Sequence, residues 1–479
     1  MSTSETFDRA HETFRDELAS VRKDGRRKWV YVRKPSGPIF RVRRLVSWVL
    51  LAFLVLAPFV KVHGQPLMLL NVLERRFIVF GIVFWPQDFY LLVLCVLAGF
   101  VTIALATAAM GRVWCGWACP QTIFMEMVFR RIEFAIDGSA QQQVRRDKGA
   151  FTFDTAWRRV VKHAIFFALS FGIANVFLAY VISADTLYTI VTDPPREHLV
   201  GLAAITVFSF VFYAVFARFR EQVCTLACPY GRVMGALLDD SSLTTTYDRP
   251  RGEPRGKLVR SGGGAVSGEA VPRGDCVDCG QCVTVCPTGI DIRNGIQLEC
   301  INCTACIDAC NDVMTRVGRP EGLIRYTSDT AVRTGTATWL TTRVKAYATV
   351  WLVLVTAATT LIATRPDLGV LILRQPGTVQ TTFDNGDLGN FYALEIINRA
   401  NRAYPLTYAV TQPDGGTITP LGDIARIEPF GQVQGRFLVR LPASAVSHTS
   451  TPVHIEVRSG NTVVDTVVTS FLGITRPTP

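Results

Sequence analysis

The stretch Cys276-Val-Asp-Cys-Gly-Gln-Cys-Val-Thr-Val-Cys-Pro287 decides how this chain folds, because its cysteine spacing returns in Cys300-Ile-Asn-Cys-Thr-Ala-Cys-Ile-Asp-Ala-Cys310. Each stretch is a C-x2-C-x2-C-x3-C run. Three thiolates at this spacing can bind three irons of a [4Fe-4S] cluster, and the fourth cysteine of each run reaches the other cluster. Zinc is the alternative, but zinc sites use separate C-x2-C pairs rather than triple runs. The spacing predicts a ferredoxin-like domain over residues 274–314 that carries two [4Fe-4S] clusters and relays electrons.

The expected ligands form two sets, each with the first three cysteines of one run and the fourth cysteine of the other run. Cluster 1 takes Cys276, Cys279, Cys282 and Cys310, and cluster 2 takes Cys300, Cys303, Cys306 and Cys286. The second run is followed by Asn311 where the first has Pro287, a difference that leaves both ligand sets intact.

Two further cysteine pairs precede this domain and repeat each other as C-x3-C-P motifs. If the motifs are helical, positions i and i+4 place both sulfurs of a pair on one face. Two or four thiolates would form a soft site that suits Cu(I), zinc or a further iron-sulfur cluster. Small, half-buried cysteines at helix ends are the alternative. These candidate catalytic thiols are Cys115, Cys119, Cys224 and Cys228.

The composition indicates a membrane protein. The chain has 479 residues, 49% of them hydrophobic, and a positive mean hydropathy of +0.26. Apolar runs long enough to cross a bilayer are expected at residues 45–60, 90–110, 164–183, 199–217 and 346–363. A sixth run, residues 77–85, is too short to span and is expected to be interfacial or re-entrant.

The charge distribution orients these spans. The segments before the first span, between the second and third, and between the fourth and fifth carry 37 Lys and Arg against 25 Asp and Glu. The other segments carry 13 against 14. By the positive-inside rule, the N-terminus and the ferredoxin-like domain are cytoplasmic and the C-terminal domain is periplasmic. The formal net charge of +11 therefore reflects topology, and no basic stripe interleaved with aromatics indicates a nucleic-acid partner.

The region after the last span changes character. Residues 366–479 contain short alternating runs at 391–397, 406–410, 435–440, 453–457 and 462–468, separated by Gly, Asn and Asp turn signals. About seven strands without a cysteine predict an immunoglobulin-like β-sandwich that docks a partner. The fold class expected is thus mixed: about five membrane helices, a two-cluster ferredoxin-like domain and a β-sandwich.

The remaining segments complete the domain plan. Residues 1–44 form a basic cytoplasmic segment, residues 45–240 a four-span membrane domain, and residues 241–273 a flexible, Gly- and Arg-rich linker. Cys95 is expected to be a small apolar residue within a span. His63, His163 and His198 are expected to be polar residues at membrane edges rather than metal ligands.

The motifs together resemble a known family. Gly111-Arg-Val-Trp-Cys-Gly-Trp-Ala-Cys-Pro-Gln121, Cys224-Thr-Leu-Ala-Cys-Pro-Tyr230, the segment 247–256 and the segment 276–314 look like the CcoG/FixG/RdxA polyferredoxins. The resemblance implies a cytoplasmic-membrane accessory protein that works with the assembly machinery of a cbb-type cytochrome c oxidase. It also implies reduction of Cu(II) to Cu(I), fed by a cytoplasmic electron donor.

Three functions remain open from the sequence. The first is a membrane-bound metal reductase that moves electrons through the two clusters to the thiol pairs, where copper is bound. The second is a non-catalytic scaffold that holds copper and docks the oxidase. The third is an electron conduit to membrane quinone.

Overall fold

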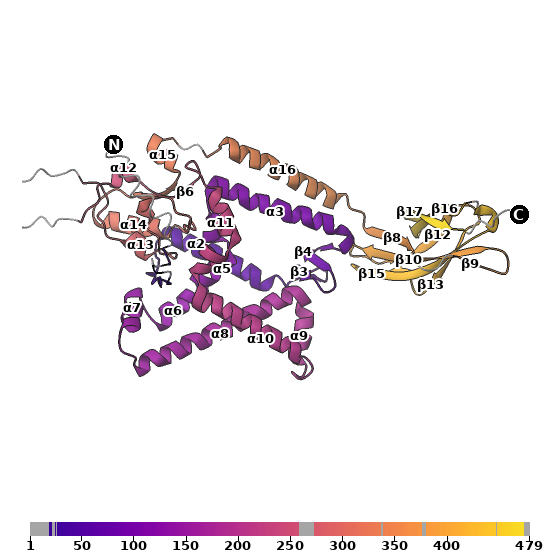
Figure 1. Cartoon of the computed structure of the whole chain (residues 1–479), viewed down its shortest axis with the longest axis horizontal. Coiled ribbons are helices and arrows are strands. Elements are labelled where there is room, and N and C mark those ends of the chain that lie inside the picture. Colours follow the sequence, from indigo (N-terminus) through magenta and orange to yellow (C-terminus); the bar gives the residue numbers. More distant parts are fainter. Residues whose placement is uncertain are drawn as a thin grey trace, which may run out of the picture. The chain divides into compact units, whose positions relative to one another are not determined.

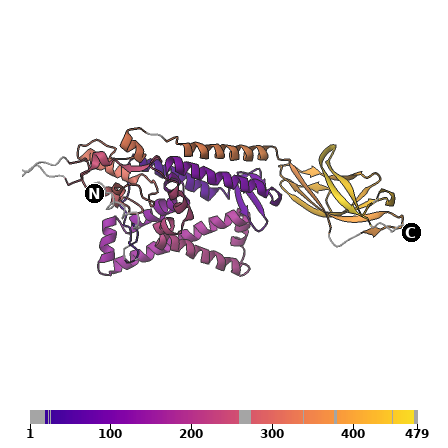
Figure 2. The same cartoon turned by 45° about the horizontal axis from the view of Figure 1, so that its top comes forward.

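The chain folds into two compact units. The computed structural model describes residues 19–21, 24, 26–257, 273–336, 339–375, 380–446 and 448–473. Unit 1 comprises Met1–Val60 and Val93–Ala357, and unit 2 comprises Lys61–Leu92 and Ala358–Pro479. Figures 1 and 2 follow the chain from its indigo N-terminal helices to its yellow C-terminal strands.

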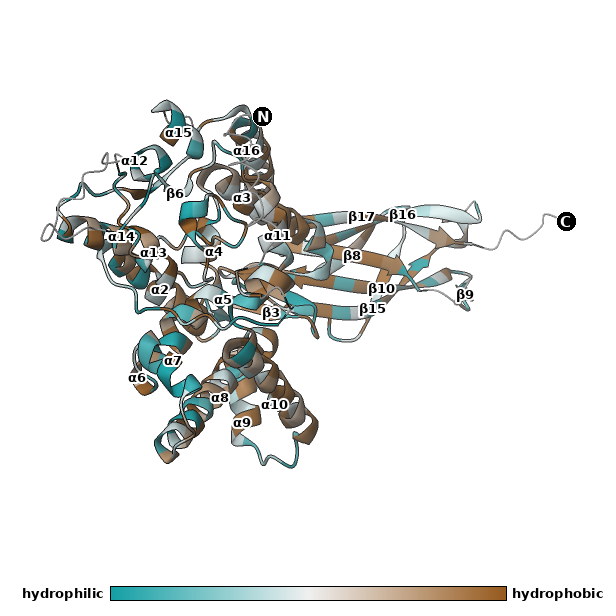
Figure 3. Ribbon diagram, turned by 60° about the vertical axis from the view of Figure 1, so that its left-hand side comes forward, coloured by the Kyte–Doolittle hydropathy of each residue, from teal (hydrophilic) through white to brown (hydrophobic). Residues whose placement is uncertain are grey.

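Four helices are long and apolar enough to cross a membrane. They are α3 (Phe89–Met110, preceded by a 3-10 turn from Pro86), α8 (Phe153–Ile182), α10 (Leu199–Ala214, continued to Phe219) and α16 (Thr342–Ala363). At most 28% of the most apolar part of each is buried within the protein. Figure 3 shows the brown, hydrophobic colouring along α10 and the teal of the polar α7 (Ala140–Lys148). Such exposed apolar surface is stable when lipid covers it.

The first expected span differs from the other four. Helix α2 (Pro38–Leu56) covers it only in part and begins several residues earlier. Its first turns carry Arg41, Arg43 and Arg44, so it does not qualify as a span among the described residues. One face of this helix end lies against protein, since Arg43 is only 1% exposed, whereas Arg41 and Arg44 are exposed. The expected count of about five spans is therefore approximate.

Helices α8 and α10 pack as an antiparallel pair, and a cluster of aromatic rings lies against them. The rings of Phe129 and Phe216 stack with centroids 4.5 Å apart, and Phe166 meets Phe129 edge-on at 4.9 Å. Phe129 comes from the π-helical segment η3 (Phe124–Phe129) and Phe216 from the π-helical η4 (Val215–Phe219). These ring contacts join the segment that follows α3 to the α8–α10 pair, and the two lie side by side in Figure 1.

Short elements connect the spans on the side of unit 1 that carries the cysteines. They are α4 (Val113–Trp117), α5 (Pro120–Ile123), α6 (Arg130–Ile136), the π-helical η5 (Val223–Ala227) and α11 (Pro229–Ala236). Helix α9 (Ala184–Thr192) lies at the other end of α8, in the connection to α10. π-Helical segments are rare and concentrate at functional sites. Here η3 follows the first C-x3-C-P motif, and η5 contains part of the second.

The ferredoxin-like domain is built on two short helices and a two-stranded sheet. Helices α13 (Gln281–Thr284) and α14 (Ala305–Arg316) pack together, and β6 (Thr244–Tyr247) pairs antiparallel with β7 (Ile324–Thr327). Helices α12 (Arg249–Gly252) and α15 (Asp329–Thr334) flank the sheet. The core includes Ile290, Ile292, Met314 and Leu323.

The expected flexible linker is ordered over its first part. Residues 244–257 form β6 and α12, and Gly256 N donates to the Cys276 carbonyl. Strand pairing explains why this part is ordered. Strand β6 pairs with β7, which follows both cysteine runs, and the composition of the linker itself does not reveal so distant a partner. Residues 258–272, with the expected Ser261-Gly-Gly-Gly264 segment, lie outside the described residues.

Unit 2 contains the C-terminal β-sandwich. One sheet has the order β13-β15-β10-β8, with β9 also on β10, and the other has the order β12-β16-β17. All pairs are antiparallel, and the two sheets enclose a core with Tyr392, Phe437, Val439 and Phe471. The strands are β8 (Leu368–Arg374), β9 (Thr381–Thr382), β10 (Leu388–Asn398), β11 (Tyr404–Pro405), β12 (Thr407–Gln412), β13 (Thr417–Leu421), β14 (Arg426–Ile427), β15 (Gln432–Leu441), β16 (Ser450–Ser459) and β17 (Thr462–Leu472).

The segment between α2 and α3 also belongs to unit 2. It forms the hairpin β1 (Lys61–Val62) and β2 (Gln65–Pro66), then the meander β3 (Met68–Asn71), β4 (Arg76–Val79) and β5 (Ile82–Phe84). Leu69, Ile78, Val83 and Trp85 of this segment pack against Ile397 of β10. The apolar run 77–85 is therefore a strand pair whose hydrophobic face is covered by the β-sandwich domain.

Candidate functional site

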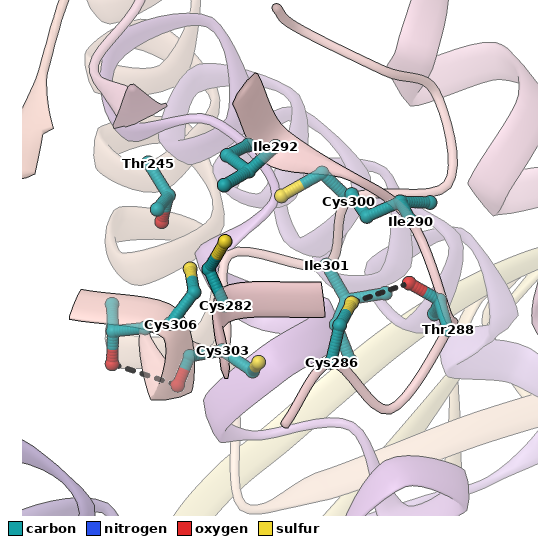
Figure 4. Close-up of a pocket in the computed structure, with 11 residues that line it drawn as sticks. Thr245, Cys282, Cys286, Thr288, Ile290, Ile292, Cys300, Ile301, Cys303 and Cys306 are labelled. Atoms are coloured by element: carbon teal, nitrogen blue, oxygen red, sulfur yellow. Dashed lines mark hydrogen bonds between the residues drawn. The ribbon is translucent and has the colours of Figure 1, made fainter. Parts of the chain in front are cut away.

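The cysteines of the two runs line two cavities of the ferredoxin-like domain. One cavity is lined by Cys276, Cys279, Cys282 and Cys310, and the other by Cys286, Cys300, Cys303 and Cys306. Figure 4 shows sulfurs of the second set around one space, with Cys282 at its boundary. The fourth cysteine of each run thus lies with three cysteines of the other run, as the spacing predicts.

The two runs adopt the same backbone conformation. Asp278 (φ 48°) and Gly280 (φ 65°) of the first run correspond to Asn302 (φ 51°) and Thr304 (φ 62°) of the second. Glycine adopts positive φ freely, whereas a β-branched residue such as Thr304 does so only when its surroundings force it. The repeated left-handed turns direct three cysteines of each run into one cavity.

The surroundings of these thiols suit an iron-sulfur cluster. Burial raises the pKa of Cys282 and of Cys300 to about 12, and that of Cys310 to about 11. Thiolates in such a buried place need a cationic partner, which iron supplies. The rest of the lining is largely apolar, including Ile290, Ile292 and Ile301. The residues present therefore fit two buried thiolate-bound clusters, and the assignment of individual ligands stays a prediction.

The two C-x3-C-P motifs share one local structure. Cys115 lies in α4 and Cys224 in η5, whereas Cys119 and Cys228 follow these helices with extended backbone (ψ 123° and 110°). Pro120 and Pro229 then begin the next helices. The condition under which both sulfurs of a pair would share one helix face is therefore not met. A proline excludes the helical conformation from the residue before it, so each second cysteine ends the first helix.

The structure brings the two motifs to one place. The pKa of Cys224 is raised to about 12, first by burial and then by the neighbouring thiols Cys119, Cys115 and Cys228. The Arg112 guanidinium lies between the motifs: its Nη2 donates to Cys115 Sγ at 3.6 Å. The same atom lies 3.0 Å from the place where a Cβ on Gly231 would stand, just after Cys228. We call these four cysteines the thiol quartet.

The described residues of the quartet do not include three sulfurs that are close enough together for a site with three or four thiolate ligands. Within the described part of the chain, no three cysteine sulfurs lie within 4.8 Å of one another. Four thiolates around a single zinc-sized ion lie about 4 Å apart, given metal–sulfur bonds of about 2.3 Å. The eight ferredoxin cysteines give the same result. To bind one ion through three or four thiolates, the quartet must close up; otherwise it holds an ion through two thiolates, or a larger group.

Buried arginines surround the first motif, and the sequence analysis did not single them out. Arg43 Nε donates to the Gly116 carbonyl at 2.8 Å, and Arg112 also donates to the Leu298 carbonyl. Both side chains are at most 3% exposed. Their charges favour the thiolate form, since Arg43 lowers the pKa of Cys303 against the larger effect of burial. An arginine within an apolar helix start is the signal that could have revealed Arg43.

The residues that were expected to be bystanders lie apart from the quartet. Cys95 is half-buried within α3, and His163 Nδ1 pairs with the Tyr213 hydroxyl at 2.9 Å. His198 lies in the loop after α9, where its Nε2 is 3.1 Å from Asp193. Glu197 completes a group of three potential metal ligands there, which the sequence analysis missed. Its side chains are partly exposed, and nothing further at that loop indicates a ligand.

Comparisons with protein families agree with this arrangement. A 4Fe-4S dicluster domain matches residues 219–329, and a 4Fe-4S binding domain matches residues 92–137. Residues 358–474 match the family described as the IG-like fold at the C-terminal of FixG. These matches confirm the expected classes of domain: iron-sulfur modules in a chain with apolar helices, followed by an immunoglobulin-like β-sandwich.

Individual relatives extend the likeness to most of the chain. The chain is 39% identical over 323 residues to the nitrogen fixation protein FixG of Rhizobium meliloti, a match that covers 65% of this chain but only 60% of that protein. It is 36% identical over 391 residues to the protein RdxA of Cereibacter sphaeroides, covering 77% and 79% of the two chains. The protein RdxB of the same organism is 32% identical over 407 residues, covering 81% and 82%.

One solved structure also matches. The crystal structure of a FixG-related protein from Vibrio parahaemolyticus is 14% identical and covers 22% of this chain and 97% of its own, with a TM-score of 0.20. The sequence relatives are the stronger finding, and they confirm the resemblance seen in the cysteine motifs. The chain therefore belongs to the FixG/RdxA family of iron-sulfur electron-transfer proteins.

Proposed function

We propose that this protein is a membrane-bound cupric reductase that supplies Cu(I) for the assembly of a cbb-type cytochrome c oxidase. Electrons come from a cytoplasmic donor, enter the ferredoxin-like domain and reach the thiol quartet. One electron converts one Cu(II), bound there as substrate, into Cu(I). No covalent bond is made or broken in the protein by this step.

The two compact units support a topology for this reaction. The loop between α2 and α3 packs with the β-sandwich domain in unit 2, and both carry few net charges. The N-terminal segment, both C-x3-C-P motifs and the ferredoxin-like domain lie in unit 1 with most of the basic residues. With the positive-inside rule, unit 1 reaches the cytoplasm and unit 2 the periplasm. The site of reduction then lies at the cytoplasmic membrane edge.

The eight ferredoxin cysteines are the proposed ligands of two [4Fe-4S] clusters. Each cluster, when bound, takes up and releases one electron. The chain contributes a dry, largely apolar enclosure, and it places basic side chains near the thiolates: Arg293 near Cys282 and Arg43 near Cys303. Net charge and solvent exposure are among the properties that set cluster potentials. These side chains therefore influence how readily each site accepts an electron.

The quartet suits the product of the reaction. Thiolate is a soft ligand that prefers Cu(I), so binding at the quartet favours reduction of Cu(II). One observation carries the proposal most strongly: Cys115 of the quartet lies in one buried cluster with Ile301 and Cys303 of the second cysteine run, where the neighbouring Gly116 meets their backbone. Because the two sites touch, an electron needs no separate carrier to pass from one to the other.

A quadruple substitution tests this function. The variant with Cys115→Ser, Cys119→Ser, Cys224→Ser and Cys228→Ser should keep the iron and sulfide of two clusters but lose reduction of Cu(II). The measurement uses anaerobically purified, dithionite-reduced protein freed of excess dithionite, with a Cu(I)-specific chromophore as readout. Cys95→Ser is the matched control and should behave as the wild type. A wild-type protein with intact clusters that left Cu(II) unreduced would sink the proposal.

The same samples separate two other outcomes. A scaffold that only holds copper predicts that Cys276→Ser, which damages cluster 1, leaves copper binding unchanged and that the wild type reduces no Cu(II). Iron in excess of two clusters in the wild type, lost in the quadruple variant, would show that the quartet binds a further iron-sulfur cluster. Either result would replace the reductase proposal.

A further inference from the structure

The first C-x3-C-P motif is pressed against one short segment of the ferredoxin-like domain, residues 298–303. Arg112 donates to the Leu298 carbonyl, and Trp117 Nε1 donates to the Asn302 carbonyl at 3.2 Å. A Cβ on Gly111 would lie 2.4 Å from Asn302 Nδ2. These contacts come from both ends of α4 and fix that helix on the second cysteine run.

Gly116 is the point of closest approach. A Cβ at this position would lie 2.3 Å from the Ile301 carbonyl oxygen and 2.9 Å from Cys303 N. Both are backbone atoms, so no side chain can move aside to make room. Gly116 has an ordinary helical place in α4, and its φ is not positive. Glycine is therefore required for contact with Cys303 rather than for backbone conformation.

The second motif lacks this feature. The residue after Cys115 is Gly116, whereas the residue after Cys224 is Thr225. Thr225 Oγ1 donates within its own helix turn, to the Glu221 carbonyl at 3.3 Å. The two repeats thus have different surfaces at corresponding positions, and the glycine is in the copy whose first cysteine shares a buried cluster with Cys303.

The other cysteine set differs in its neighbours and in its exposure. Neither cavity is lined by residues of α4, α5 or α11, but the contacts of α4 are with residues 298–303 of the second run and none of those given above is with the first set. Its Cys279 is exposed, while Cys303 of the second set is only 7% exposed. A soluble donor can approach the first set, and the second set reaches the membrane edge.

We propose that electrons enter at the set that contains Cys279, leave from the set that contains Cys303, and cross to Cys115 through the backbone contact at Gly116. Gly116 is the positioning residue of this crossing. This inference rests on the proposed function and adds its direction and route. In each crossing the donor site loses one electron, Cu(II) at the quartet gains it, and no proton moves. Electron transfer falls steeply with distance, so a displaced α4 slows it.

Gly116→Ala tests the route, with Gly99→Ala as matched control because a Cβ on Gly99 meets nothing within 4 Å. Three measurements are made on the full chain in detergent. Iron, sulfide and the extent of dithionite reduction should match the wild type in both variants. Alkylation of Cys115, which is buried by the contact, should rise several-fold in Gly116→Ala only. Reoxidation of the reduced protein by Cu(II) should slow several-fold in the same variant.

The outcomes distinguish the route from the function. If the wild type reduces Cu(II) and Gly116→Ala does so at the same rate, with Cys115 more exposed, the route is wrong and the reductase function stands. If the wild type itself reduces no Cu(II), the proposed reductase function is wrong, and the route that rests on it is wrong as well. Should Gly116→Ala lose iron, Trp117→Phe replaces it, since this removes the hydrogen bond to the Asn302 carbonyl while keeping an aromatic ring at that position. Unchanged reoxidation and Cys115 alkylation in Trp117→Phe would then overturn the route.

Discussion

Asp88 shows how single residues hold unit 2 together. Its carboxylate accepts two hydrogen bonds from Arg399, at 2.8 and 2.9 Å, and lies 3.3 Å from Arg365 Nη1. All three side chains are at most 10% exposed. Asp88 precedes α3, Arg365 follows α16 and Arg399 follows β10. One buried carboxylate thus connects the ends of two membrane helices with the β-sandwich domain.

We expect Asp88→Asn to destabilise unit 2 by about 3 kcal/mol, because removing one partner leaves buried charges without compensation. Hydrogen exchange at the amides of β8 and β10, measured on the full chain, reports this loss without assuming that the whole protein unfolds in one step. Glu428→Gln is the control, since Glu428 and Arg426 are both 67% exposed. Equal protection in Asp88→Asn and Glu428→Gln would show that the buried group contributes nothing.

At the scale of elements, the ferredoxin-like domain caps a helix of the membrane domain. Asp308 of α14 accepts hydrogen bonds from Phe40 N at 2.7 Å and from Ile39 N at 3.3 Å, both in the first turn of α2. A carboxylate satisfies the unpaired N–H groups at a helix start and complements its dipole. Gly37 leaves room for it, since a Cβ there would lie 2.3 Å from Asp308 Cγ. The domain is therefore docked on α2.

We expect Asp308→Ala to weaken this docking by about 1 kcal/mol, the usual cost of losing a helix cap. Faster hydrogen exchange at the Ile39 and Phe40 amides would report it, with iron content measured on the same sample. Asp308→Asn keeps a capping oxygen and should lose less. Asp312→Ala alters an exposed pair with Arg316 on the same helix and should leave both amides unchanged. Exchange that is equally fast in Asp308→Ala and Asp312→Ala would argue against the cap.

The elements that the sequence predicts well are those with a local period. Residues 90–110, 164–183 and 346–363 match α3, α8 and α16 to within a residue at their C-terminal ends, although α8 begins at Phe153 and α16 at Thr342, and the runs at 391–397 and 453–457 lie in β10 and β16. The strands of 68–84 pair with one another across short turns, and they were missed because the apolar run 77–85 was interpreted as an interfacial or re-entrant segment. Extended backbone at Cys119 and Cys228 was foreseeable, because each precedes a proline.

The candidate site likewise has one part that local sequence predicts and another part that depends on residues far apart in the sequence. The grouping of the cysteines around two cavities agrees with the spacing, because the cysteines of each run are close in sequence and the fourth cysteine of each run lies with the other set, whereas the ligand assignment itself stays a prediction. Contact between the quartet and Cys303 could not be derived, since it depends on how α4 meets residues 298–303. Its signal in the sequence was small: Gly116 in one repeat where the other has Thr225.

At the scale of the whole molecule, the topology is the property on which the proposed function depends. Segments placed outside by charge contain no cysteine at residues 61–89, 184–198 or 364–479. A membrane-impermeant maleimide added to intact spheroplasts should therefore leave the wild type unlabelled. Single introduced cysteines then report each side against a clean background.

We expect Glu74→Cys in the β3–β4 turn and Asp414→Cys in the β-sandwich domain to be labelled from outside, since both positions are exposed and belong to unit 2. Gln141→Cys, exposed on α7 in unit 1, should be labelled only after the membrane is permeabilised. Labelling of Asp414→Cys without Glu74→Cys would contradict the packing of the loop on the β-sandwich. Labelling of Gln141→Cys in intact spheroplasts would place the cysteine motifs outside, where a cytoplasmic donor could not reach them, and would overturn the direction of electron flow.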